Sequence, residues 1–415
     1  MKNLINLAVK NLTRHTKRTL ITGIAMAFGI AMLIWMDGML RWADNESKRN
    51  LQRYEFGNFI ISTKEFKTDR KNYPLNFMMD KETIRKVIEI AEGLGCSASP
   101  RTGFISLLSF NRGFGLPYVL MAMDPEKDSR VFSLKENILT GKYPDPEDTG
   151  VLISSVCSRE LNAGIGDFIT IETRTRYNTY QSIDIKVTGI FNAPDPVVNR
   201  NQVFITRALA DSQLQTEGTA SEIVVRSPSG ENEPFLSRMR QGLASAGLEK
   251  DLVIETWQDL GSDFLAISQT KRGGSRIFML LIFIIVAVGI INTMLMAVFE
   301  RVREIGMLRA LGMSDREVIW SFILEAAGIG FIGSFAGVLL GIGLDAYSVY
   351  VGLDFSSLFE DMDIGYRTGS VFYNEWNPDM MLLGFIFGIL CTVLVSILPA
   401  RKAVKMEITD SIRYI

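Results

Sequence analysis

Four long apolar blocks interrupt a sequence of 415 residues that is otherwise mixed in polarity. Residues 19–36, 277–299 and 380–399 carry no charged side chain, and residues 318–344 carry only Glu325. A helix that crosses about 30 Å of hydrocarbon needs about 20 apolar residues, so each block predicts a membrane-spanning helix. Buried helices of soluble proteins seldom run so far without a charge.

The first block follows a basic segment, as the apolar core of a cleaved signal peptide would. It is longer than a typical signal-peptide core of about 7–15 residues. No small-residue cleavage site follows it, because the chain continues through Met36, Asp37 and Gly38 to Met39. We therefore expect a span that stays in the protein.

The flanking charges predict the orientation of the spans. Residues 1–18 carry five basic and no acidic side chains, and residues 400–415 carry four basic against two acidic ones. Residues 345–379 carry seven acidic side chains and a single Arg. Short basic flanks stay on the cytoplasmic side, so we expect both termini and residues 300–317 inside and residues 37–276 outside.

These patterns predict an α-helical membrane protein with four transmembrane helices in a 1 + 3 arrangement and a large α/β extracytoplasmic domain. The expected order is a cytoplasmic amphipathic elbow (1–18), a first span (19–36), the extracytoplasmic domain (37–276), a second span (277–299), a cytoplasmic helix and turn (300–317), a third span (318–344), an extracytoplasmic loop (345–379), a fourth span (380–399) and a cytoplasmic tail (400–415).

The segment between the first two spans predicts alternating strands and helices. Short runs of β-branched and aromatic residues bounded by turn residues predict strands at Asn58–Ser62, Tyr118–Met121, Phe168–Glu172, Ile183–Ile190, Gln202–Ile205 and Glu222–Arg226. Apolar residues at three- and four-residue spacing predict helices over Lys81–Glu92, Ser155–Ala163 and Glu233–Ala246.

Composition excludes several classes of function. The net charge of −2 leaves no basic excess for a nucleic-acid partner, and 47% hydrophobic residues is too many for a disordered chain. A single histidine, His15, excludes a multi-histidine metal site, so we expect no metal. Three cysteines cannot form a disulfide framework, although Cys96 and Cys157 both lie outside, where a bond between them is one option.

The segment after the second span predicts an amphipathic helix. Apolar residues recur every third position, at Val302, Ile305, Leu308 and Leu311. Gly312 suits the position that ends a helix, and Ser314 with Glu317 predicts a capping box that starts the next one. A helix that rests on lipid is usually strongly basic, whereas this loop has four basic and four acidic residues. A protein partner explains it better.

This segment carries a motif that resembles the signature of the FtsX/MacB/LolC–LolE family of ABC transporter permeases: Glu300-Arg301-x-x-Glu304-Ile305-Gly306-x-x-Arg309-Ala310-Leu311-Gly312. Further resemblances lie at Asn11-Leu-x-Arg14, Phe322-x-x-Glu325 and Pro399-Ala400-Arg401. In the outer segment, Gly164-x-Gly166-Asp167 and Val187-Thr-Gly189-Ile190-Phe191 resemble a MacB-like periplasmic core domain.

The resemblance implies a non-catalytic membrane subunit that works by mechanotransmission. Two permeases, as two copies or with a LolC-like paralogue, would pair with a LolD-like cytoplasmic ATPase dimer that binds ATP and Mg. This chain has no GxxxxGK[ST] motif, so it would bind no nucleotide itself. The resemblance assigns coupling to the ATPase to Glu300, Arg301, Glu304, Ile305, Gly306, Leu308, Arg309, Leu311 and Gly312.

Among family members, the size of the outer domain fits the lipoprotein-releasing type in a bacterial inner membrane. The hairpin that would hold a chaperone-binding hook turns over only residues 177–180, which resembles the LolE-type partner and leaves chaperone docking open. Acyl chains of a lipoprotein would lie against Met36, Met39, Leu40 and Trp42, unless these residues only pack at the interface. The alternatives are an FtsX-like scaffold that controls a cell-wall hydrolase and a MacB-like permease for another amphiphile.

Two features of the third span suggest helix packing and an intramembrane role. Gly333, Gly337 and Gly341 form a small-residue face that suits either a seam between permeases or packing within one chain. Glu325 is a costly carboxylate inside the span. In one interpretation it reaches the inner surface or pairs with Arg316 or a C-terminal basic residue, and in the other it has a proton or gating role.

Overall fold

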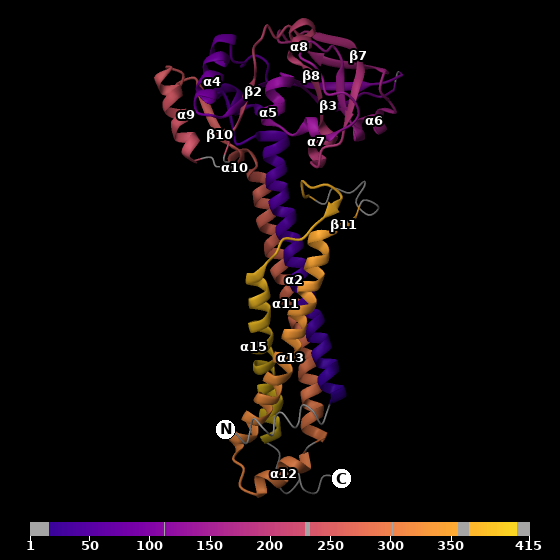
Figure 1. Ribbon diagram of the computed structural model, residues 1–415, viewed down its shortest axis with the longest axis vertical. Helices are drawn as coiled ribbons and strands as arrows, with labels where there is room; N and C mark the ends of the chain where they lie inside the picture. The colour runs from indigo at the N-terminus through magenta and orange to yellow at the C-terminus, as the bar shows by residue number, and fades with distance from the viewer. Residues whose placement is uncertain (1–15, 112, 229–232, 301, 356–364, 405–415) are drawn as a thin grey trace. The chain divides into compact units, whose positions relative to one another are not determined.

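The computed structural model describes residues 16–111, 113–228, 233–300, 302–355 and 365–404. The chain divides into two compact units, each considered by itself (Figure 1). The helical unit comprises Met1–Ala43, Ser268–Ser357 and Val371–Ile415, and the outer domain comprises Asp44–Ile267 and Leu358–Ser370.

The helical unit is built from four long helices, which are α2 (Thr16–Asn50), α11 (Ser262–Glu300), α13 (Asp315–Tyr350) and α15 (Pro378–Val404). The short helix α12 (Val302–Ala310) lies between α11 and α13 in the chain. Strands β11 (Leu353–Asp354) and β12 (Val371–Phe372) pair between α13 and α15.

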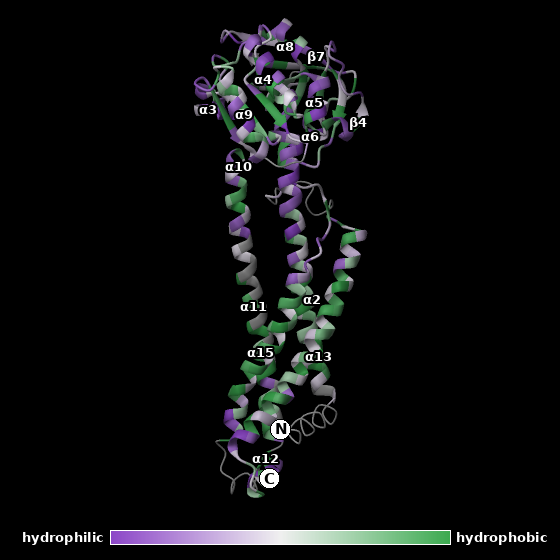
Figure 2. Cartoon of the chain, turned by 60° about the vertical axis from the view of Figure 1, so that its left-hand side comes forward, coloured by the Kyte–Doolittle hydropathy of each residue, from purple (hydrophilic) through white to green (hydrophobic). Residues whose placement is uncertain are grey.

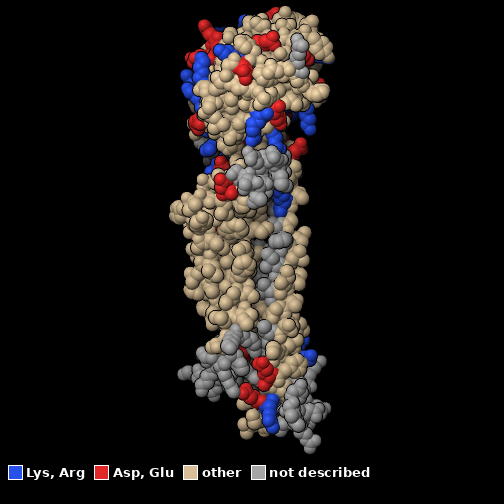
Figure 3. Space-filling model, turned by 90° about the vertical axis from the view of Figure 1, so that its right-hand side faces the viewer, with Lys and Arg blue, Asp and Glu red and all other residues tan. Residues whose placement is uncertain are grey.

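Among the described residues, three helices are long and apolar enough to cross a membrane: Thr19–Phe56, Asp315–Tyr350 and Pro378–Val404. Figure 2 shows their apolar stretches in green, and Figure 3 shows a wide band of the helical unit with almost no charged side chain. In position, length and composition these helices agree with the first, third and fourth predicted spans. The second predicted span lies within α11, whose apolar stretch among the described residues is Ala287–Glu300, and it stays a prediction.

Helix α2 continues well beyond its apolar block because its polar half supports itself by ion pairs along one face. Arg41 pairs with Asp37 at 2.6 Å, and Lys48 pairs with Asp44 at 2.8 Å, each four residues apart. Such pairs stabilise a helix by about 0.2–0.5 kcal/mol each. The π-helical turn η1 (Leu51–Phe56) then leads into the first strand.

Six strands of the outer domain close into a barrel. They are β2 (Ser97–Ser109), β3 (Leu116–Met123), β8 (Gln202–Thr206), β5 (Val151–Ser154), β7 (Tyr180–Phe191) and β6 (Phe168–Arg174). The ring closes because β6 pairs with both β7 and β2. Alternate residues from every strand fill its interior, among them Leu120, Ile153, Ile171 and Val187. Strand β4 (Ile138–Gly141) pairs with β7 outside the ring.

A second layer extends the sheet through β9 (Glu222–Arg226), β1 (Phe59–Thr63) and β10 (Leu252–Thr256). Helices α4 (Lys81–Gly93) and α9 (Glu233–Ser245) pack on it over a separate apolar core. Strand β2 belongs to both layers, because its first residues pair with β9 and its last with β6. One continuous strand therefore joins the two cores.

The remaining elements are short and connect these layers. They are α3 (Lys64–Thr68), η2 (Arg70–Asn72), α5 (Pro125–Val131), η3 (Leu134–Asn137), α6 (Ser155–Leu161), α7 (Pro196–Asn201), α8 (Arg207–Leu214) and α10 (Trp257–Leu260). Cys96 lies in the core under α4 and Cys157 in the barrel core, and both are free thiols. The optional bond between them is therefore absent.

Candidate functional site

Helix α12 carries the residues predicted to couple to an ATPase. One of its faces turns inward, where Val302 and Gly306 are buried and Ile305 packs on a core from α11, α13 and α15. Its other face presents Met307 and Leu308, and Leu311 follows it with 86% of its surface exposed. Helix α12 and the residue that follows it therefore present an apolar surface, and no described residue covers Leu311.

The ends of this segment are held by backbone chemistry that the sequence indicated. Gly312 has φ +101° and donates its N–H to the Arg309 carbonyl at 3.0 Å, while Met313 donates to the Leu308 carbonyl at 3.0 Å. This pair of bonds is a Schellman motif, which ends a helix at a glycine.

The charged residues of this segment have mixed environments. Arg309 forms an ion pair with Asp315 at 2.9 Å, Glu304 is half-buried and Glu300 is exposed. The predicted capping box is present, since the Ser314 N–H donates to the Glu317 carboxylate at 2.9 Å. Arg301 lies outside the described residues.

The glycine face of α13 packs against α2 of the same chain. A Cβ atom added at Gly337 would lie 2.9 Å from the Ala27 carbonyl oxygen, and one at Gly341 would lie 2.9 Å from Ile34. At Gly333 the nearest atom would be the Met26 sulfur, at 3.2 Å. The face thus serves packing within one chain.

Glu325 lies on the same helix and its side chain is almost fully buried. Its pairing and its gating role both stay predictions.

A ladder of polar contacts continues the packing of α2 beyond this face. The Trp35 indole N–H donates to the Ser348 hydroxyl at 2.8 Å. The Asn374 amide donates to the Trp35 carbonyl at 2.9 Å, and the Asn377 amide to the Ile34 carbonyl at 2.9 Å. Both asparagines are buried, so these bonds replace water and hold α2 against α13 and the segment before α15.

The residues proposed to face a substrate lie on this stretch of α2 and are all half-buried: Met36, Met39, Leu40 and Trp42. The Trp42 ring packs against Phe372 and Tyr373, each at 5.6 Å between ring centroids. Trp42 therefore serves internal packing.

Arg367, the single basic residue of the acidic loop, is anchored inside the outer domain. Its guanidinium donates to Glu55 and, at 3.3 Å, to Asp195, which is fully buried. Its backbone N–H donates to the Ser47 hydroxyl at 2.9 Å, and its carbonyl accepts from the Asn50 amide at 2.7 Å. Four contacts thus tie Arg367 to the end of α2, to Glu55 of η1 and to Asp195 before α7.

This anchor places two carboxyl groups against one guanidinium. Burial raises the pKa of Glu55 to about 7, and the Arg367 charge opposes that shift only in part. Burial also raises the pKa of Asp195, again against the attraction of Arg367. Glu55 lies in the polar continuation beyond the first span. Sequence reasoning missed this cluster, although a lone Arg among seven acidic residues was a signal for it.

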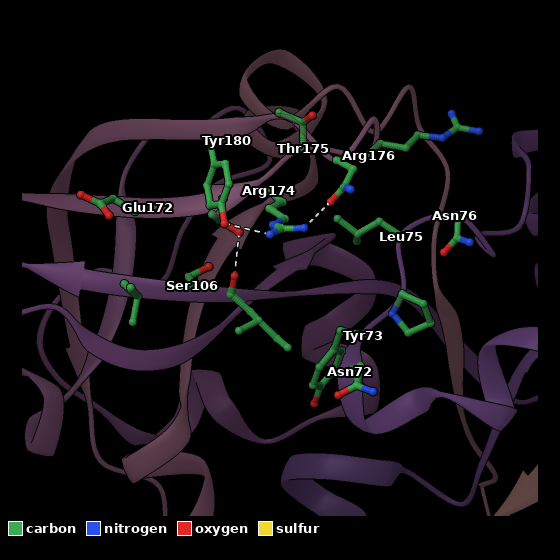
Figure 4. Close-up of a pocket in the computed structure, with 15 residues that line it drawn as sticks. Asn72, Tyr73, Leu75, Asn76, Ser106, Glu172, Arg174, Thr175, Arg176 and Tyr180 are labelled. Atoms are coloured by element: carbon green, nitrogen blue, oxygen red, sulfur yellow. Dashed lines mark hydrogen bonds between the residues drawn. The ribbon is translucent and has the colours of Figure 1, made fainter.

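A groove of about 650 Å³ opens on the outer face of β2 and β6, beside the loop 72–76. In Figure 4 Arg174 lies at its centre, beside Tyr180 and facing Leu75. Arg174 donates to the Asn178 side chain at 2.7 Å and to the Tyr180 hydroxyl at 2.8 Å. The walls of this groove combine the exposed Ile105 side chain with amide and hydroxyl groups. Such a lining suits a partner with both apolar and polar surface.

Comparison with known proteins bears on both units. Residues 19–241 match the family model described as MacB-like periplasmic core domain, and residues 276–408 match the FtsX-like permease C-terminal model. The uncharacterized ABC transporter permease YvrN of Bacillus subtilis (strain 168) is 23% identical over 99% of each chain.

Two more distant matches carry informative names. The lipoprotein-releasing system transmembrane protein LolC of Neisseria meningitidis serogroup B is 21% identical over 70% of this chain and 71% of its own. The crystal structure of the periplasmic region of MacB from Actinobacillus actinomycetemcomitans aligns with 50% of this chain and 91% of its own, with 12% identity and a TM-score of 0.35.

Replacing Gly337 by Ala should destabilise the protein, because the new methyl group meets the backbone of Ala27, which cannot move aside. We expect a loss of about 1–3 kcal/mol, the usual cost of overpacking. The matched control is Gly343→Ala on the same helix, where a Cβ meets nothing within 4 Å. Thermal unfolding of the detergent-solubilised protein measures both, and equal losses would contradict the close packing.

The Arg367 anchor should make stability depend on pH. Since the folded pKa of Glu55 lies above its unfolded value, its stabilising effect is complete below about pH 4 and is lost as the pH rises towards about 7. Thermal unfolding should therefore show a loss on the order of 1–2 kcal/mol between about pH 5 and about pH 8. Glu55→Gln should flatten this dependence and exposed Glu126→Gln should not. Parallel curves of stability against pH for the unmodified protein and both variants would refute this role of Glu55.

Proposed function

The chain belongs to the FtsX- and MacB-like family of ABC transporter permeases, and we propose that it works by mechanotransmission. It is a multi-pass membrane protein with an extracytoplasmic domain, and a permease subunit of this kind implies a partner ATPase. In the proposed mechanism the ATPase, which binds ATP and Mg, moves α12. The bundle helices then carry this movement to the outer domain.

The observation that supports this mechanism most is the length of two helices. At 1.5 Å per residue, the 35 residues of α2 extend about 52 Å and the 39 residues of α11 about 58 Å. A hydrocarbon core is only about 30 Å thick, so both helices continue beyond it without a flexible joint. Helix α11 begins soon after β10 and ends next to α12. A single helix therefore connects α12 to the outer domain along the chain.

For the substrate, we propose a lipoprotein that the permease releases from the inner membrane. The similarity to LolC supports this class, as does an outer domain with a groove that suits a protein surface. The β6–β7 hairpin turns over Thr175–Thr179 only, so no hook-like insertion for a periplasmic chaperone is present there. A second permease copy or a LolC-like paralogue would complete the complex, with both termini on the cytoplasmic side.

Two other functions are compatible with the same mechanism. The chain would be an FtsX-like scaffold if the moving outer domain switches a cell-wall hydrolase, and a MacB-like permease if it exports another amphiphile. Both would use the same coupling through α12, so the substrate has to be tested separately from the coupling.

Depletion of the protein tests the substrate. We expect lipoproteins to accumulate in the inner membrane, because their extraction needs the work that the ATPase supplies. Membranes separated by density, with lipoproteins followed by a radiolabelled acyl chain, give the measurement. An unchanged distribution would reject lipoprotein release and leave the family assignment in place, while mislocalised cell-wall hydrolysis would favour the scaffold.

Replacing Leu311 by Asp tests the coupling surface. Burying one leucine side chain contributes about 1.5–3 kcal/mol, so ATPase binding should weaken by roughly tenfold to a hundredfold. Co-purification of the ATPase with the permease measures the loss. Leu139→Asp is the matched control, an equally apolar substitution site on β4 with 59% exposure. Undiminished ATPase recovery with the Leu311 variant would refute docking through this residue.

A further inference from the structure

A second groove of the outer domain gathers cations from three helices. It has a volume of about 510 Å³ and lies between α4, α5 and α8, which Figure 1 labels. Its charged lining residues are Lys81, Arg85, Glu89, Glu92, Lys127 and Arg207. Four cations face two carboxylates there, although the whole predicted outer segment is nearly balanced in charge.

Part of this positive charge lies near carboxylates, since Asp211 and Asp124 attract the Arg207 guanidinium. Arg85 pairs with Glu89 at 3.5 Å. Within the described ranges, Lys81, Lys127 and Arg207 form no ion pair, and Lys127 is half-buried. Charges held together without partners repel one another and cost free energy in the empty groove.

Arg207 adds an unsatisfied donor. One nitrogen of its guanidinium donates to the Gly218 carbonyl at 2.8 Å. A second nitrogen, Nη1, is buried and has no hydrogen-bond partner among the described residues. A buried N–H group without an acceptor costs about 1–3 kcal/mol, and more when it is charged. This group therefore lowers the stability of the folded protein.

The loop at Gly218 brings two of these cations together. Gly218 has φ +71°, and a Cβ atom there would lie 2.1 Å from the Lys81 Cε atom, so the lysine stem lies directly on the glycine. The Gly218 N–H donates to the Asp211 carboxylate at 2.7 Å, which fixes the loop. Gly218 thus contacts both cations. Its carbonyl accepts a hydrogen bond from Arg207, and the Lys81 stem packs against its Cα atom.

The position of these cations within their helices is also unfavourable. Lys81 is the first residue of α4 and Arg207 the first of α8. The first turn of a helix carries a partial positive charge, which favours acidic residues and disfavours basic ones. A bound anion would offset both the repulsion and the unfavourable positions of the two cations at the starts of their helices.

We propose that this groove binds a phosphate group, held by Lys81, Lys127 and Arg207. Cations from three helices surround the groove, which matches a dianion with oxygens on several sides better than the single plane of a carboxylate. The phosphate can come from inorganic phosphate or from the head of a phosphorylated envelope lipid. This inference is independent of the proposed transport function.

The test uses the full-length protein in neutral detergent, titrated with inorganic phosphate at constant ionic strength by calorimetry. We expect saturable binding that weakens about tenfold or more in Lys81→Gln/Lys127→Gln, because each lost charge-assisted contact contributes about 1.5–3 kcal/mol. Exposed Lys71→Gln/Lys250→Gln is the control and should bind as the unmodified protein does. Equal unfolding temperatures exclude a folding defect.

Short-chain phosphatidic acid in the same titration distinguishes the two sources. Tighter binding than inorganic phosphate, with the same sensitivity to the double variant, identifies a phosphorylated lipid, and equal or weaker binding identifies the free ion. Absence of saturable binding, or equal binding by the two double variants, would overturn the proposal.

Discussion

Everything the helical unit does depends on the close approach of α13 to α2 at Gly333, Gly337 and Gly341. Inside a bilayer apolar surface gains nothing by leaving lipid, so helices associate through tight packing and hydrogen bonds. The glycines allow the first, and the polar ladder from Trp35 to Asn377 supplies the second. Together they fix α2 against α13, so α2 cannot bend or slide independently where its polar half begins.

The Arg367 anchor is a second restraint, and it lies within the outer domain. The loop between α13 and α15 belongs partly to each compact unit, and residues 365–370 are bound through Ser47, Asn50, Glu55 and Asp195. Burial raises the pKa of both carboxyl groups, and the single guanidinium that they share opposes this shift. The anchor thus combines a mechanical link with a sensitivity to proton concentration.

Much of this architecture could be predicted because its patterns are local. Charge-free blocks identified the spans, and Gly312 with Ser314 and Glu317 marked the ends around α12. Strand β2 was missed because Pro100 and Gly103 interrupt it, and β5 because four residues are too few for a periodic pattern. The helices also extend beyond the predicted spans, since polar helix turns carry no apolar signal.

The groups that form the outer sites could not be predicted for a different reason. Glu55, Asp195 and Arg367 come from three distant parts of the chain, and so do Lys81, Lys127 and Arg207. No spacing rule connects such residues, because only the closed sheet brings them together. A lone basic residue in an acidic loop was the nearest available hint.

Strand β2 belongs to both layers, so an anion in the proposed phosphate groove would have a mechanical effect. Helix α4 packs on the core of the second layer, whereas α8 contributes Leu209 and Leu214 to the barrel core. Within the outer domain, the pairing of β2 with both β9 and β6 joins these two cores. An anion bound by Lys81 on one core and Arg207 on the other would add a charged cross-link between them. Such a cross-link would stiffen the outer domain, because the two cores could not shift against each other without separating the cations from the anion.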